Sequence, residues 1–89
     1  MNSRTTQRFR KALAVLPEDV RTRARLAYRL FASDPWHAAL QFKQVHPSEP
    51  IYSVRVGLGY RALGIRQDET VIWFWIGSHA EYDRLVTQR

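Results

Sequence analysis

The segment Thr70–Ile76, with the sequence TVIWFWI, constrains the fold of this 89-residue chain more than any other feature. It is short, rich in β-branched and aromatic residues, and apolar at both odd and even positions. A strand of this kind is buried on both faces, because alternate side chains point to opposite sides of a sheet. The segment therefore predicts a sheet that holds residues 70–76 as an internal strand.

Further strands precede this one in the chain. Residues 51–56 alternate, Gly57-Leu58-Gly59 provides a tight turn, and residues 60–66 return antiparallel. Residues 41–46 form a weaker strand. We therefore expect a mainly antiparallel, twisted sheet of three to four strands over about residues 41–76.

The first third of the chain has helical periodicity. Apolar residues recur at helical spacing through residues 4–16, and Leu16-Pro17-Glu18-Asp19 is typical of a break followed by a new helix. That second helix ends at Ser33-Asp34-Pro35. The two helices predict a hairpin over about residues 4–32 that covers the sheet.

A short C-terminal helix is expected over about residues 79–87. Ser78-His79-Ala80-Glu81 fits the S-x-x-E capping box, with Ser78 as the N-cap and Glu81 as its partner. The whole chain, residues 1–89, is thus predicted to be a single α+β domain.

Composition excludes several classes of protein. The chain has no cysteine, so neither a disulfide framework nor a thiolate zinc site is possible. No apolar run approaches the roughly 20 residues of a membrane span, and no secretory signal is recognisable. We expect a cytoplasmic protein without membrane contact.

The charge is basic and concentrated near the N-terminus. The net charge is +6, and residues 1–32 hold eight basic and two acidic residues. Arginine dominates, which favours bidentate contacts with phosphates or carboxylates. The stripe Arg21, Arg25 and Arg29 is therefore expected to bind an RNA backbone or an acidic protein segment.

Strand geometry brings two arginines together. A turn centred on Leu58 places Arg55 opposite Arg61, on the face away from the helices. Like charges so placed cost about 0.2–1 kcal/mol, so either an anion binds between them or both side chains splay into water. A second turn, centred on Asp68, would place Arg61 opposite Trp75 and stack its guanidinium on the indole.

The C-terminal helix adds a histidine and a tyrosine to this face. His79 lies in the first helical turn, where the macrodipole disfavours the imidazolium, so we expect a neutral ring. Tyr82 lies on the same side of the helix. Arg61, His79 and Tyr82 are thus candidate catalytic residues for phosphodiester cleavage, and the alternatives are a surface cap for His79 and core packing for Tyr82.

Other candidate contacts follow from charge. Arg55, Lys43 and Arg66 are assigned to phosphate or RNA binding. His37, His46 and His79 lack the spacing of metal ligands, so no metal ion or other cofactor is expected.

Nearly the whole chain, from about residue 7 to 86, resembles the RelE/ParE superfamily of type II toxin–antitoxin toxins, specifically its ParE-like branch of cytotoxic translational repressors. The strings that carry the resemblance are YSVRVG at residues 52–57, YRALG at 60–64 and WFWIGSHAEYD at 73–83. The resemblance implies a small toxin that is neutralised by a cognate antitoxin.

The RelE branch implies a ribosome-dependent mRNA endonuclease that works without a metal ion. Arg55 and Arg61 match its basic strand positions, His79 its C-terminal basic residue, and Tyr82 its tyrosine. Ser53 is a departure, because RelE toxins often carry a second basic residue there. Two alternatives stay open: a non-enzymatic ParE-type toxin that inhibits DNA gyrase, and a basic RNA-binding module without toxicity.

Overall fold

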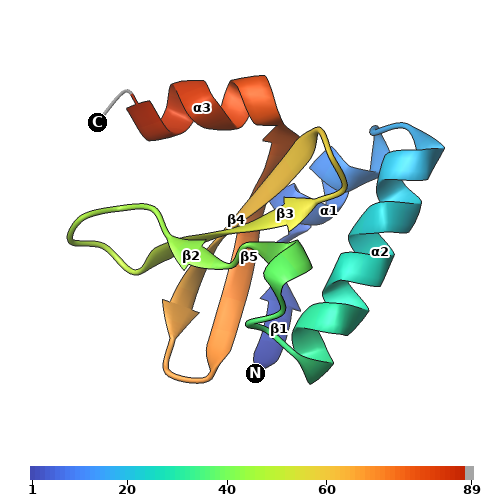
Figure 1. Cartoon of the computed structure of the whole chain (residues 1–89). Helices are drawn as coiled ribbons and strands as arrows, with labels where there is room; N and C mark the ends of the chain where they lie inside the picture. The colour runs from blue at the N-terminus through green and yellow to red at the C-terminus, as the bar shows by residue number, and fades with distance from the viewer. Residues whose placement is uncertain (88–89) are drawn as a thin grey trace.

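A five-stranded mixed sheet forms the centre of the protein, in a computed structural model that describes residues 1–87 (Figure 1). The strand order is β1-β5-β4-β3-β2, with β1 parallel to β5 and the other neighbours antiparallel. The elements are β1 (Asn2–Thr5), α1 (Gln7–Ala14), α2 (Glu18–Ser33), the short 3-10 helix η1 (Ala38–Leu40), β2 (Lys43–Gln44), β3 (Ile51–Val56), β4 (Tyr60–Gln67), β5 (Thr70–Ser78) and α3 (His79–Thr87).

The α+β class and the internal position of β5 are confirmed, but the sheet has five strands where three to four were predicted. The additional strand is β1, which includes Arg4, and α1 begins only at Gln7. Thr6 caps this helix, because its hydroxyl accepts a hydrogen bond from the Phe9 N–H at 3.1 Å. The predicted helix start at residue 4 is therefore wrong. Residues 2–5 are all polar, so their hydropathy does not alternate as that of a half-buried strand does, and the strand they pair with, β5, lies near the other end of the chain.

One face of the sheet packs against α1 and α2 and forms the main core. Phe31 of α2 is 2% exposed, and its ring lies 5.4 Å from the Trp73 ring and 4.9 Å from the Phe42 ring, both edge-on. The predicted helical hairpin therefore covers the sheet as expected, and it leaves the opposite face of β3 and β4 to other contacts.

The register of β3 and β4 is as predicted, with Arg55 opposite Arg61. The register of β4 and β5 is not: Arg61 lies opposite Gly77 rather than Trp75, so the predicted stack of Arg61 on Trp75 is wrong. The turn holds only Asp68 and Glu69, one residue fewer than the predicted turn over residues 67–69, and a bulge at Leu63/Gly64 shifts the pairing again.

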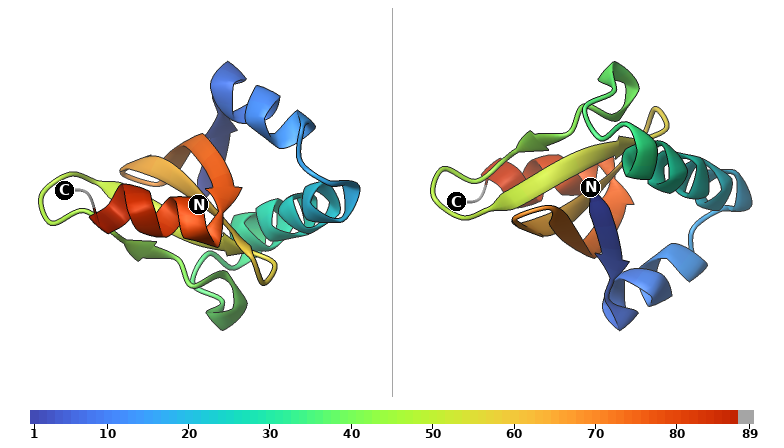
Figure 2. Two further views of the ribbon diagram at one scale, coloured as in Figure 1. Left: turned by 90° about the horizontal axis from the view of Figure 1, so that it is seen from above. Right: turned by 90° about the horizontal axis from the view of Figure 1, so that it is seen from below.

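The last helix, α3, lies on the other side of the sheet from α2 (Figure 2). Its predicted capping box is confirmed: the Ser78 hydroxyl accepts from the Glu81 N–H at 3.2 Å, and Glu81 accepts from the Ser78 N–H at 3.0 Å. The His79 N–H donates to the Gly59 carbonyl at 2.8 Å, which ties α3 to the β3–β4 turn. No helix within residues 1–87 has the length and apolar character to cross a membrane.

Candidate functional site

Arg61 is buried beneath the sheet face that α1 and α2 leave uncovered. Its side chain is only 3% exposed. The guanidinium donates to the Gln41 Oε1 at 3.1 Å, to the Gln41 carbonyl at 3.2 Å and to the Ser53 Oγ at 2.9 Å. Gln41 reaches it from a left-handed conformation, at φ 46°, directly after η1. Arg61 is thus held by neutral acceptors, and its Nε has no hydrogen-bond partner among the described residues.

Tyr82 closes this cluster from α3. The Arg61 guanidinium carbon lies 5.0 Å from the Tyr82 ring centroid, and the Tyr82 hydroxyl donates to the Ser53 Oγ at 3.3 Å. Ser53 is fully buried between them. Burial lowers the pKa of Arg61, and the charge of Arg55 acts in the same direction, whereas Tyr82 and Asp83 raise it. A guanidinium remains cationic under such a shift, so a positive charge is fixed beneath this face.

His79 is the accessible member of the predicted catalytic group. Its Nδ1 lies 3.1 Å from Asp83 Oδ2, with 52% of the His79 side chain exposed. Its ring centroid lies 5.7 Å from that of Tyr82. With Asp83 as the acceptor for Nδ1–H, Nε2 is the ring nitrogen that can accept a further proton.

Asp83 was not among the residues singled out from the sequence. The available signal was its position four residues after His79, which places the two side chains on one helix face. A nearby carboxylate stabilises an imidazolium, so this pair is suited to proton acceptance.

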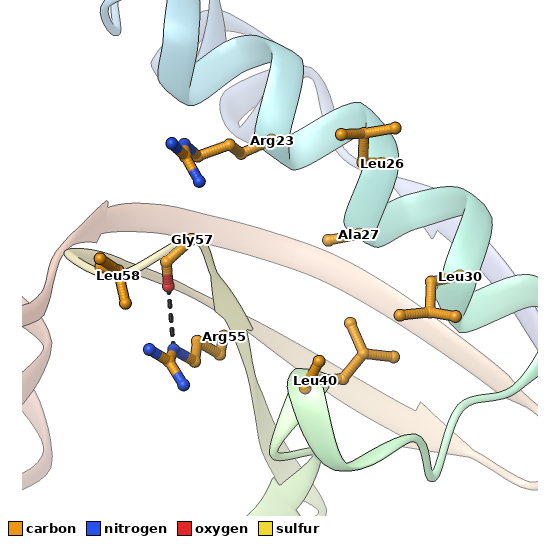
Figure 3. Close-up of a pocket in the computed structure, with 9 residues that line it drawn as sticks. Arg23, Leu26, Ala27, Leu30, Leu40, Arg55, Gly57 and Leu58 are labelled. Carbon is orange, nitrogen blue, oxygen red and sulfur yellow. Dashed lines mark hydrogen bonds between the residues drawn. The ribbon is translucent and has the colours of Figure 1, made fainter.

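Arg55 and Lys43 lie near this cluster but are more accessible. Lys43 is exposed and pairs with Ser53, so both side chains share one face of the sheet. Arg55 is half-buried, and its Nε donates to the Gly57 carbonyl at 3.0 Å (Figure 3). Neither alternative for this pair describes the structure: the two arginines do not converge on one open anion site, and they do not both splay into water, because Arg61 turns inward and Arg55 turns toward the β3–β4 turn.

Arg66 lies apart from the other predicted phosphate ligands. Its guanidinium sits 5.6 Å from the Trp36 ring centroid and 5.4 Å from that of Tyr52, on the sheet face that α2 covers. The structure therefore does not bring Arg66 together with Arg55 and Lys43.

The stripe on α2 is also separate from the candidate site. Arg25 and Arg29 are exposed, and Arg21 donates to the Leu16 carbonyl. These residues lie on the helix that covers the opposite face of the sheet, so any partner they bind approaches from that side.

A groove between α2, η1 and the β3–β4 turn was not foreseen from the sequence (Figure 3). Its volume is about 300 Å³, and its lining is mainly leucine and alanine. Arg23 and Arg55 stand at one end, and neither forms an ion pair within residues 1–87. The sequence signal that could have indicated this groove was the apolar character of Leu26 and Leu58, two residues that the structure shows to be exposed.

The described residues contain no group of three or more His, Cys, Asp or Glu side chains that could hold a metal ion. The chemistry that this site can perform with its own groups is proton transfer by His79 and charge stabilisation by the surrounding cations.

Comparison with known proteins identifies relatives of the fold. The ParE-like toxin domain family matches residues 18–84. No curated protein matches the sequence.

Solved toxin structures resemble the chain over most of its length. The RelB–RelE antitoxin–toxin complex from Methanococcus jannaschii aligns with a TM-score of 0.71 at 23% identity, covering 91% of this chain and 96% of that chain. YafQ from Escherichia coli BL21(DE3) aligns with a TM-score of 0.71 at 12% identity, with the same coverage. The RelBE2 toxin–antitoxin complex from Mycobacterium tuberculosis aligns with a TM-score of 0.59 at 26% identity, covering 88% and 96%.

Proposed function

Because the chain belongs to the ParE-like toxin domain family of the RelE/ParE superfamily, we propose that it is the toxin of a toxin–antitoxin pair. We further propose that it stops translation by cleaving mRNA on the ribosome. The observation that carries the nuclease proposal is the hydrogen bond between His79 and Asp83 at 3.1 Å, beside the buried charge of Arg61. A polarised imidazole next to fixed positive charge is suited to phosphodiester cleavage.

In the proposed reaction, Nε2 of His79 accepts the proton of a ribose 2′-hydroxyl. The 2′-oxygen then forms a bond to phosphorus while the bond from phosphorus to the 5′-oxygen breaks, and the 5′-oxygen takes a proton from water. The hydroxide that remains takes the proton held by His79, which returns the imidazole to its neutral form. The products are a 2′,3′-cyclic phosphate and a 5′-hydroxyl. Asp83 stabilises the imidazolium that forms on His79.

Charge on the phosphate is balanced by two kinds of cation. Lys43 and Arg55 are accessible and would contact the phosphate oxygens directly. Arg61 and Tyr82 are buried, so we assign them to positioning: Tyr82 supports the His79 ring, and Arg61 contributes its field and holds Ser53 and Tyr82 in place.

The test is transcript mapping in a purified translation system. The wild-type chain is expected to produce new 5′ ends within translated mRNA, and His79→Ala is expected to lose them. His37→Asn is the matched control, because an amide oxygen can replace the ring nitrogen that accepts from the Ala39 N–H at 3.0 Å. Equal cleavage by His79→Ala would remove the catalytic assignment.

We propose a cognate antitoxin as the protein partner, with an acidic amphipathic segment seated in the groove beside α2. The groove offers an apolar floor and two guanidinium groups, Arg23 and Arg55, that form no ion pair within residues 1–87. Because Arg55 also serves the phosphate site, an occupied groove would remove one RNA contact. Arg23→Glu is expected to weaken capture of the protein encoded beside this gene, and unchanged capture would place the antitoxin elsewhere.

The burial of Arg61 and Tyr82 favours a second candidate function, a toxin that inhibits DNA gyrase without cleaving RNA. Two of the three predicted catalytic groups are 3% and 6% exposed and do not reach solvent directly. This candidate expects inhibited supercoiling with intact transcripts, so a supercoiling assay run beside transcript mapping separates the two.

A further inference from the structure

Four side chains from separate segments form a cluster at the end of the sheet away from α3. Trp36 follows α2, Phe42 precedes β2, Tyr52 lies on β3 and Arg66 on β4. The Arg66 guanidinium lies over both the Trp36 and the Tyr52 rings, at 5.6 and 5.4 Å. The centroid of the Phe42 ring lies 4.9 Å from that of Trp36 and 4.9 Å from that of Tyr52, and the Phe42 ring is stacked on the Tyr52 ring. We call these four residues the Trp36 cluster.

The members of the Trp36 cluster differ in exposure: Phe42 is buried, Tyr52 and Arg66 are partly buried, and Trp36 is exposed. Phe42 is 7% exposed, whereas Trp36 is 58% exposed despite its contacts with Phe42 and Arg66. Tryptophan is usually well buried in monomeric proteins. An indole that is held by contacts with Phe42 and Arg66 and is still open to solvent is suited to binding a ligand.

The chemistry of the Trp36 cluster favours a nucleobase over a protein side chain. Alternating aromatic rings and a guanidinium are the groups on which unpaired bases stack. Trp36 is the one large apolar residue exposed within residues 32–39, and its exposed neighbours are small or polar (Ala32, Ser33, Asp34, His37, Ala38 and Ala39), so the indole is not the centre of an extended patch of large apolar side chains.

The position of the Trp36 cluster also suits a single RNA strand. The strand β4 runs from Tyr60, beside the start of α3, to Arg66 in the cluster, a distance of about 20 Å at the usual rise of a β-strand. Lys43, which shares the face of the candidate site, directly follows Phe42 of the cluster. The cluster lies on the sheet face that α2 covers and Lys43 on the opposite face, so an RNA strand that wraps around the edge strand β2 would meet the indole, then the lysine, then the His79 side of the sheet.

We infer that Trp36 is a stacking site for an unpaired RNA base, separate from His79 and outside the groove beside α2. This inference rests on the proposed RNA-directed function, and it adds a base contact to a site otherwise described by phosphate contacts. Arg66 and Tyr52 hold the indole in place, and the base stacks on its open surface.

The experiment measures binding of a short oligoadenylate to the full chain. Trp36→Ala is expected to weaken binding by about 5- to 150-fold, the range for one lost base stack. The salt dependence should keep its slope, because no phosphate contact is removed. Lys43→Ala should instead reduce that slope, and Val15→Ala, which truncates another exposed apolar residue, should change neither.

A second variant, Trp36→Phe, keeps the inference testable if Trp36→Ala fails to fold. In Trp36→Phe, which keeps an aromatic ring, the quenching of tryptophan fluorescence by RNA should disappear while binding is largely retained. Unchanged affinity in Trp36→Ala, or full quenching in Trp36→Phe, would overturn the inference. Unchanged RNA binding with weaker antitoxin binding would show a protein contact and would overturn it too.

The outcome for Trp36 can be told apart from the outcome for catalysis. His79→Ala should cleave no transcript, and adding Trp36→Ala to it should still weaken oligonucleotide binding by the same factor as in the wild type. If the wild-type chain stacks RNA on Trp36 but never cleaves it, the nuclease proposal fails and the base-stacking site stands.

Discussion

The Nδ1 atom of His79 lies 3.1 Å from Oδ2 of Asp83, one turn further along α3. We expect Asp83→Asn to lower the rate of transcript cleavage by about tenfold or more, because an amide stabilises the imidazolium less than a carboxylate does. His79→Ala should lower it by about 10²- to 10⁴-fold. Single-turnover cleavage assays provide the measurement. Since Asp83 acts through His79, the double variant should be no slower than His79→Ala alone, and additive losses would contradict the pairing.

Tyr82→Phe should separate positioning from catalysis. The hydroxyl of Tyr82 contacts the fully buried Ser53, so its loss should cost about 1 kcal/mol of unfolding free energy. The ring still lies against Arg61 and His79 in this variant, and we expect cleavage within a few-fold of wild type. A loss as large as that of His79→Ala, in a folded variant, would make the phenol a catalytic group.

Arg61 and Arg55 face each other across β3 and β4 but should differ in their importance for folding. Arg61→Ala removes a buried guanidinium with three hydrogen bonds and leaves Ser53 without its closest donor, at a cost of about 2–4 kcal/mol. Arg55→Ala removes one bond at a half-exposed position, at a cost of about 0.5–1 kcal/mol. Urea denaturation of both variants tests this ranking, and equal midpoints would refute it.

The β3–β4 turn contains two glycines with different requirements. Gly57 has φ +63°, and a Cβ there would lie 2.6 Å from the Arg23 Cδ. Gly57→Ala should therefore destabilise the fold by about 1–2 kcal/mol. Gly59 has open space around it, so Gly59→Ala is the matched control and should stay within about 0.5 kcal/mol of wild type. Thermal unfolding of the pair distinguishes a strained turn from a tolerant one.

Acid should weaken the start of α3. Hydrogen bonds from the backbone N–H and the hydroxyl of Ser78 lower the pKa of Glu81. A carboxyl group with a lower pKa in the folded state contributes stability above its unfolded pKa and loses it as the pH falls through its folded pKa. The stability difference between wild type and Glu81→Gln should therefore be present near neutral pH and shrink below about pH 4.3. Unfolding curves across this range measure it, and a constant difference would exclude the capping carboxylate as the cause.

Local patterns were sufficient for most elements. Residues 51–56 matched β3 to the residue, because alternation, a glycine turn and a return strand are encoded within a few positions. The capping box at Ser78 and Glu81 matched for the same reason, since both partners of the cap lie within one helical turn. The pairing of Arg55 with Arg61 followed from the length of the turn between them.

The parts that failed depend on contacts between distant segments. Residues 2–5 become a strand only because β5 offers them a free edge, and Arg61 misses Trp75 because the β4–β5 turn is one residue shorter than predicted and a bulge at Leu63/Gly64 shifts the register again. An added Cβ at Gly64 would lie 2.5 Å from the Val71 Cγ1, so this glycine permits the close approach of β5.

The sequence by itself determined the fold class, the toxin family and the presence of Arg61, Tyr82 and His79 near one face. Only the tertiary structure decided their accessibility. Gln41, Ser53 and α3 enclose Arg61 and Tyr82, whereas His79 stays half-exposed beside Asp83. The burial of a residue depends on which distant segments of the chain pack against it, and the residues next to it in the sequence do not determine those contacts.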